Sequence, residues 1–196
     1  ETGGIQWMTA GRGIIHSEMP EQEEGQLAGF QLWVNLPAAQ KMVDPCYREF
    51  SAREIPKELR TNDVNVHVIA GHTSRGTRGP VQDVATNPMY LDITLPAGQS
   101  FDEPLPTEYS AFVFVIKGPL YVCASTSDKN YLGESNQLVT LGPGDRVLLS
   151  ASDIPARCLL VAGRPINEPI ARYGPFVMNT REEIVQAAED FQSGRF

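Results

Sequence analysis

Short apolar segments alternate with glycine and proline turns along most of this 196-residue chain, which contains 17 Gly and 15 Pro. Residues 64–70 and 89–95 alternate apolar with polar side chains, and residues 111–116 are almost entirely apolar. A Gly-Pro-Gly-Asp turn at 142–145 precedes further segments of the same kind. Short strands separated by glycine turns are typical of a β-sandwich or barrel. We therefore expect residues 63–165 to form a closed, mostly antiparallel barrel.

The ends of the chain carry signals for three further elements. Residues 5–8 and 30–36 have the composition of strands, and the second of these segments ends at a proline. Thr180 is a suitable N-cap, and Glu183 follows it three residues later, which is the pattern of a capping box. The sequence therefore predicts one short C-terminal helix at about residues 180–192.

The composition excludes several classes of function. The formal net charge is −8, and no basic patch offsets it, so the surface would repel a nucleic-acid backbone. No apolar run approaches the ~18 residues that a transmembrane helix needs. With 41% hydrophobic and 20% charged residues the chain can build a packed core. We expect no direct nucleic-acid binding, no membrane insertion and a monomeric protein.

The three cysteines, Cys46, Cys123 and Cys158, lie far apart in the sequence. An odd number with such spacing does not form a disulfide framework, and it fits a reducing compartment. We interpret each cysteine as a small buried apolar residue rather than a reactive thiol. The corresponding expectation is a cytoplasmic location, with the nucleus also open for a eukaryotic protein.

His16 and Glu18 are the residues with the clearest chemical potential. Their spacing of two places both side chains on the same face of a strand. An imidazole and a carboxylate on one face could share a metal ion such as iron. The plain alternative is an exposed histidine and glutamate on a solvated surface, and the spacing alone leaves both possibilities open.

Several longer segments together resemble one protein family. These segments are QWMTAGRGIIHSEMP at 6–20, QLWVNL at 31–36, KMVDP at 41–45, Ile-Pro at 55–56 and GPFVMNT at 174–180. In combination they resemble the pirin family of the cupin superfamily, and the resemblance covers nearly the whole chain. It implies an all-β bicupin, with two double-stranded β-helix (jelly-roll) barrels in tandem and a short C-terminal helix.

The resemblance also implies a metal site in the N-terminal barrel. Pirins hold one Fe(II) with three histidines and a glutamate, and the third histidine and the glutamate match His16 and Glu18. The other two histidines come from an upstream His-x-His segment, which the 196 residues do not contain. We therefore expect a fragment with an incomplete iron site. Residues 1–60 would form the second half of the metal-binding barrel, and 61–196 the second barrel with the helix.

Three further expectations concern other candidate residues and the stability of the chain. Gln31 and Trp33 share one face of the segment 30–36, where they either form ordinary outward polarity or line a pocket beside the metal. His67 and His72 are interpreted as surface residues. Because an incomplete barrel leaves unpaired edges, residues 1–50 should be less stable than the second barrel.

The implied functions belong to two classes. Some pirin-like proteins are quercetin 2,3-dioxygenases, which act on a small aromatic substrate with O₂; there Glu18 would ligate the iron and could also act as a base. Other pirins are iron-dependent regulatory proteins that bind a protein partner, either as transcription cofactors or on metabolic enzymes, without turnover. A truncated chain could also be inactive. The sequence leaves these functions open.

Overall fold

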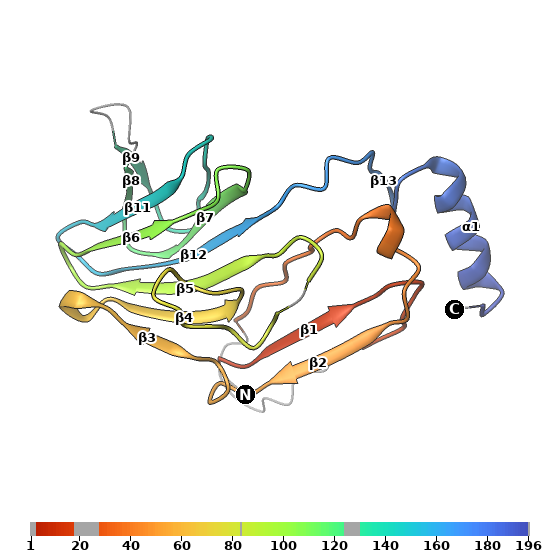
Figure 1. The fold of residues 1–196 in the computed structure, drawn as a ribbon, viewed down its shortest axis with the longest axis horizontal. Coiled ribbons are helices and arrows are strands. Elements are labelled where there is room, and N and C mark those ends of the chain that lie inside the picture. Colours follow the sequence, from red (N-terminus) through yellow and green to blue (C-terminus); the bar gives the residue numbers. More distant parts are fainter. Residues whose placement is uncertain (1–2, 18–27, 83, 124–129, 196) are drawn as a thin grey trace. The chain divides into compact units, whose positions relative to one another are not determined.

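The computed structural model describes residues 3–17, 28–82, 84–123 and 130–195, and Figure 1 shows the course of the chain. Most of its elements are strands, which confirms the all-β fold class. The strands are β1 (Ile5–Thr9), β2 (Cys46–Phe50), β3 (Lys57–Leu59), β4 (Asn65–Ala70), β5 (Met89–Leu95), β6 (Ser100–Pro104), β7 (Ser110–Lys117), β8 (Leu120–Cys123), β9 (Tyr131–Gly133), β10 (Leu138–Thr140), β11 (Arg146–Ala151), β12 (Ala156–Gly163), β13 (Ala171–Tyr173) and β14 (Phe176–Met178). The helical elements are α1 (Arg181–Gln192) and two 3₁₀ turns, Ala38–Gln40 and Thr61–Asp63.

The chain divides into two compact units, each of which is described by itself. As far as they are described, residues 3–6 and 49–165 form the first, here called the two-sheet unit. Residues 7–48 and 166–195 form the second, here called the helical unit because it contains α1. The division of the chain into domains over 1–60 and 61–196 stays a proposal.

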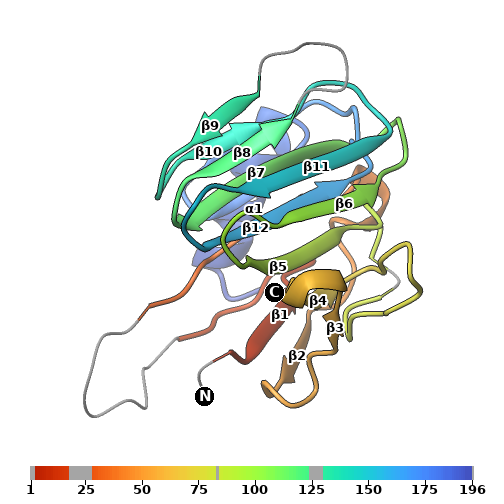
Figure 2. The ribbon, with the colours of Figure 1, turned by 90° about the vertical axis from the view of Figure 1, so that its left-hand side faces the viewer.

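Two antiparallel sheets make up most of the two-sheet unit. One has the strand order β10-β7-β12-β5-β4-β3, and the other has the order β6-β11-β8-β9. Figure 2 shows β6 and β11 in one layer and β5 and β12 in the other. The antiparallel strands predicted for residues 63–165 are therefore present, as two facing sheets. The predicted closure into one barrel is not seen, because no ladder joins the two sheets among the described residues.

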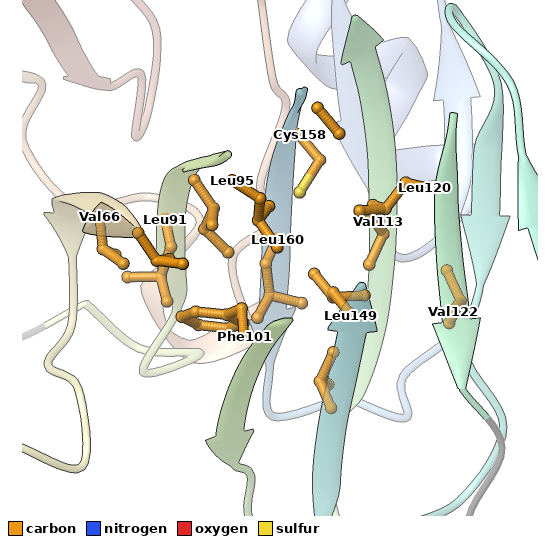
Figure 3. Close-up of a cluster of buried hydrophobic side chains, with 14 of the residues drawn as sticks. Val66, Leu91, Leu95, Phe101, Val113, Leu120, Val122, Leu149, Cys158 and Leu160 are labelled. Atoms are coloured by element: carbon orange, nitrogen blue, oxygen red, sulfur yellow. The ribbon is translucent and has the colours of Figure 1, made fainter. Parts of the chain in front are cut away.

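The core of this unit lies between the two sheets. In β5 the apolar residues Leu91, Ile93 and Leu95 are fully buried, whereas Thr94 is exposed, as the period of two requires. Figure 3 shows Leu91, Leu95, Phe101, Leu149 and Leu160 directed into the same interior. The buried face of each strand thus follows from the alternation in its sequence.

The cysteines differ from one another in environment. Cys158 belongs to this core, and burial raises the pKa of its thiol. Cys123 is partly buried, and Cys46 is exposed. The interpretation of Cys46 as a buried residue is therefore wrong. Its strand, β2, pairs with β1 in a sheet of two strands, which is too small to bury both of its faces.

In the helical unit, β13 and β14 form an antiparallel hairpin that leads directly into α1. The helix begins where the sequence predicts, because Thr180 and Glu183 form the capping box. The rings of Phe176 and Phe191 meet edge to face with centroids 6.1 Å apart, which fastens the helix to the hairpin. The described residues include no helix with the length and apolar character needed to span a bilayer.

The strand predicted for residues 30–36 is wrong, since the structure assigns no strand there. Leu32 and Val34 are less exposed than Gln31 and Trp33, so the alternation in the sequence persists. However, the backbone N–H of Leu36 donates to the side-chain Oδ1 of Asn35 at 2.9 Å instead of to a neighbouring strand. An asparagine side chain that bonds its local backbone competes with a ladder in this way.

Candidate functional site

The turn before His16 is fixed by a close approach of two backbone segments. Gly11 has φ +53°, and a Cβ there would lie only 2.1 Å from the carbonyl oxygen of Val43. The N–H of Arg12 donates to that same oxygen at 2.9 Å. Arg12 also forms an exposed ion pair with Asp44 at 3.1 Å. Glycine is therefore required at position 11 for conformation and for space.

His16 itself lies outside any strand. The structure assigns no strand to residues 14–17, and the His16 side chain is exposed. The expectation that His16 lies on a strand is therefore wrong. Glu18 lies outside the described residues, so the sharing of a metal ion by His16 and Glu18 stays a proposal.

The residues that the structure describes do not by themselves form a metal site. Among them, no three His, Cys, Asp or Glu side chains converge on a point that could hold an ion. The other two histidines lie in the two-sheet unit. His67 is half-buried on β4, where burial lowers its pKa and Asp92 only partly opposes this effect, and His72 is exposed.

The two pocket candidates differ in their contacts. Gln31 is exposed. Trp33 is 55% exposed, and the guanidinium carbon of Arg172 lies 5.2 Å from the centre of its ring. A cation placed over an indole ring at an exposed site stabilises the contact by about 0.5–1 kcal/mol. The indole is thus held by an arginine from the C-terminal segment, and its role in a substrate pocket stays a proposal.

A buried lysine in the helical unit is a feature that the sequence does not predict. Lys41 is only 5% exposed, and its Nζ donates to Oδ1 of Asn35 at 2.7 Å and to the carbonyl oxygen of Val177 at 3.4 Å. Burial lowers the pKa of Lys41, while the charges of Glu168 and Glu183 oppose that shift. The ammonium therefore links two segments that lie far apart in the sequence.

Carboxylates complete this network. Oε2 of Glu168 accepts from the N–H of Ala38 at 2.7 Å and from Nδ2 of Asn179 at 2.9 Å. Oε2 of Glu183 accepts from the N–H groups of Asn179 and Thr180, both at 2.9 Å. Lys41 and Asn179 lie within segments that carry the family resemblance. Only the three-dimensional fold, however, brings them together.

The two-sheet unit contains a second buried polar cluster. Arg60 is 8% exposed and donates to Oε1 of Glu58 at 2.7 Å and to Oε2 of Glu103 at 2.5 Å. The other carboxylate oxygen of Glu58 accepts from the hydroxyl of Thr73 at 2.5 Å. Burial acts to raise the pKa of Glu58, but hydrogen bonds from Thr73, Thr77 and Arg60 outweigh it, so the pKa is lowered and the carboxylate stays charged.

Comparison with known proteins supports a family assignment. Residues 90–196 match the family model of the Pirin C-terminal cupin domain, and residues 1–34 match that of Pirin. A pirin-like protein of Caulobacter vibrioides is 50% identical over 194 residues, which are 99% of this chain and 68% of that protein. The pirin of Homo sapiens is 42% identical over 98% of this chain and 65% of its own length.

A solved structure gives the same result for the fold. Quercetin 2,3-dioxygenase from Acinetobacter baumannii matches with a TM-score of 0.86 and 34% identity, over 100% of this chain and 67% of that one. The chain thus spans about two thirds of the length of these relatives. Because half the residues are shared with one pirin-like protein and both family models match, the chain belongs to the pirin family of cupin proteins.

Proposed function

We propose that this chain is part of an iron-dependent quercetin 2,3-dioxygenase, which acts on a flavonol with O₂. The observation that carries the proposal is the similarity to a solved quercetin 2,3-dioxygenase over the whole of this chain, with a TM-score of 0.86. Fold alone does not determine activity, so the proposal rests on the residues of the site as well as on this similarity.

In this proposal His16 and Glu18 are two of the ligands of Fe(II). Histidine and carboxylate side chains are a common ligand set of non-haem iron. Glu18 would also act as a base toward the substrate, and Gln31 and Trp33 would border the pocket. Because the described residues do not assemble a set of three ligands, we assign no catalytic step to the metal.

The test uses the full-length parent protein and the 196-residue chain in parallel. After loading with Fe(II) and dialysis, the parent should retain iron and turn over quercetin in air, whereas the 196-residue chain should retain little. A site that needs about three or four ligands cannot hold the ion tightly with two. In the parent, His16→Ala should lose the iron, and the matched variant His67→Ala should keep it.

Two results would contradict the metal assignment. One is full retention of iron by the parent with His16→Ala, and the other is stoichiometric iron in the 196-residue chain. The second candidate function, which membership in the pirin family leaves open, is an iron-dependent regulatory protein. A parent protein that keeps its iron but leaves quercetin unchanged would favour that function.

A further inference from the structure

A cavity of about 370 Å³ lies in the two-sheet unit, where β4 and β6 end and β5 begins. Its lining comes from the residues after β4, those before β5, and the end of β6 with the turn that follows. Its polar lining residues are His72, Ser74, Asn87, Glu103 and Tyr109, and Gly71 contributes backbone. The volume falls in the range of about 300–1,000 Å³ that small-molecule sites occupy.

The walls of this cavity are largely apolar and stiff. Pro88, Pro104, Pro106, Met89 and Leu105 contribute to them. Proline has a fixed φ and no backbone N–H, so these wall segments offer little flexibility and few hydrogen-bond donors. Such walls favour an apolar ligand over a strongly polar one.

Two segments that line the cavity approach each other through their backbones. Gly71 has φ +71°, and a Cβ there would lie 2.5 Å from the carbonyl oxygen of Pro88. Two lining segments therefore meet without a side chain between them. This contact fixes the spacing of the wall independently of any ligand.

A hydroxyl donor is available at the cavity. Nδ2 of Asn87 donates to Oη of Tyr109 at 2.7 Å, so this oxygen acts as an acceptor. The hydroxyl of tyrosine can accept and donate at the same time. No acceptor for its own proton is found among the described residues. A bound molecule with an acceptor oxygen could receive that proton in a hydrogen bond.

The charge at the cavity disfavours an anion. The Glu103 side chain is fully buried, and its carboxylate accepts from Arg60 and from the backbone N–H of Ser74 at 2.6 Å. Glu103, Arg60 and Glu58 form a cluster of two carboxylates and one guanidinium, so the net charge of the cluster is one negative charge. This net charge would repel an anionic ligand but not a neutral one.

We propose that this cavity binds a small, uncharged, largely apolar molecule whose carbonyl oxygen accepts a hydrogen bond from Tyr109. The exposed imidazole of His72 lines the same cavity and offers a second polar contact. The proposal concerns the two-sheet unit only, and it does not depend on iron binding or on dioxygenase activity.

The test is a titration of the ¹⁵N-labelled 196-residue chain with chromone, an uncharged bicyclic ketone. For a ligand of this size we expect a dissociation constant on the order of 1 mM. Amide signals of residues 71–74, 87–89 and 105–109 should shift, as far as these residues have an N–H. Chromone-2-carboxylate, which differs by one negative charge, should bind at least about tenfold more weakly.

Substitutions inside and outside the cavity test the assignment of Tyr109 as the donor. Tyr109→Phe keeps the ring and removes the hydroxyl, so it should weaken chromone binding by about five- to tenfold. Tyr131→Phe, which changes an exposed tyrosine outside the cavity, should leave the affinity unchanged. His16→Ala should also leave it unchanged.

Four results would overturn the proposal. The first is the absence of shifts at the residues of the cavity. The second is an affinity of Tyr109→Phe equal to that of the wild type. The third is equal binding of chromone and its carboxylate. Loss of chromone binding in His16→Ala would likewise overturn it, because the ligand would then occupy the candidate iron site.

Discussion

The guanidinium of Arg60 lies 4.3 Å from the centre of the Phe101 ring and donates to two carboxylates and to the carbonyl oxygen of Asp102. A buried charge of this kind is tolerated when the polar atoms around it have partners. Removal of the cation would leave Glu58 and Glu103 as buried carboxylates that repel each other. The cluster is thus more sensitive to substitution than an ion pair on the surface.

We therefore expect Arg60→Met to lower the free energy of unfolding by about 3–5 kcal/mol, as for other buried ion pairs that lose one partner. The measurement is urea unfolding of the two-sheet unit, followed in the 196-residue chain. Arg146→Met is the matched control, because Arg146 pairs with Asp102 at 3.2 Å and both side chains are about half exposed. This control substitution should lower the free energy of unfolding by no more than about 1 kcal/mol. Equal decreases in the free energy of unfolding for both variants would show that burial does not increase the contribution of the Arg60 ion pairs to stability.

Gly11 and Lys41 show which features could be predicted from the sequence and which could not. The turn at Gly11 follows from local composition, but the reason for glycine there is the carbonyl oxygen of Val43, thirty-two residues away. Lys41 has the sequence context of an ordinary exposed lysine, and only the fold buries it against Asn35 and Val177. Local signals predict turns well, whereas buried polar contacts depend on partners that the sequence does not identify.

At the scale of elements, α1 is the clearest case of a structure encoded locally. Oγ1 of Thr180 accepts from the N–H of Glu183 at 3.2 Å, and the Glu183 carboxylate accepts from the N–H of Thr180 at 2.9 Å. Both contacts lie within four consecutive residues. The alternation in β5 is equally local, and the observed strand covers the predicted residues 89–95. Residues 30–36 have a similar alternation but no strand, because a strand also needs a neighbour with which to pair.

The capping box gives a prediction for the helix. Thr180→Ala removes the acceptor for the N–H of Glu183, and we expect a loss of about 1 kcal/mol in the local stability of α1. Hydrogen exchange of the amides in the first turn should become about fivefold faster. Thr180→Ser keeps the hydroxyl and serves as the control, with exchange close to that of the wild type. Equal exchange in the alanine and serine variants would mean that packing alone holds the N-terminus of α1.

At the scale of the whole molecule, the buried apolar residues are distributed very unevenly. Among the described residues, nearly all apolar side chains in the buried class belong to the two-sheet unit, and in the helical unit Ile184 alone does. The helical unit also exposes large apolar side chains, such as Ile170 at 69% and Tyr173 at 71%. Burial of apolar surface is the main favourable contribution to folding, so the two units should differ in stability.

This difference leads to a prediction for the 196-residue chain. Amides in β5, β7 and β12 lie in the centre of a six-stranded sheet and should exchange only when the two-sheet unit unfolds. Amides in β13, β14 and α1 have little core beneath them and should exchange at least about a hundredfold faster, which corresponds to ~2.8 kcal/mol.

Native-state hydrogen exchange measured by NMR provides the test, with β3 as an internal control. β3 is a short edge strand of the six-stranded sheet, so fast exchange in β3 reports edge exposure rather than an unstable unit. If the hairpin and α1 exchange as slowly as β5, β7 and β12, the two units unfold together. In that case the polar network around Lys41, rather than apolar burial, would have to supply the stability of the helical unit.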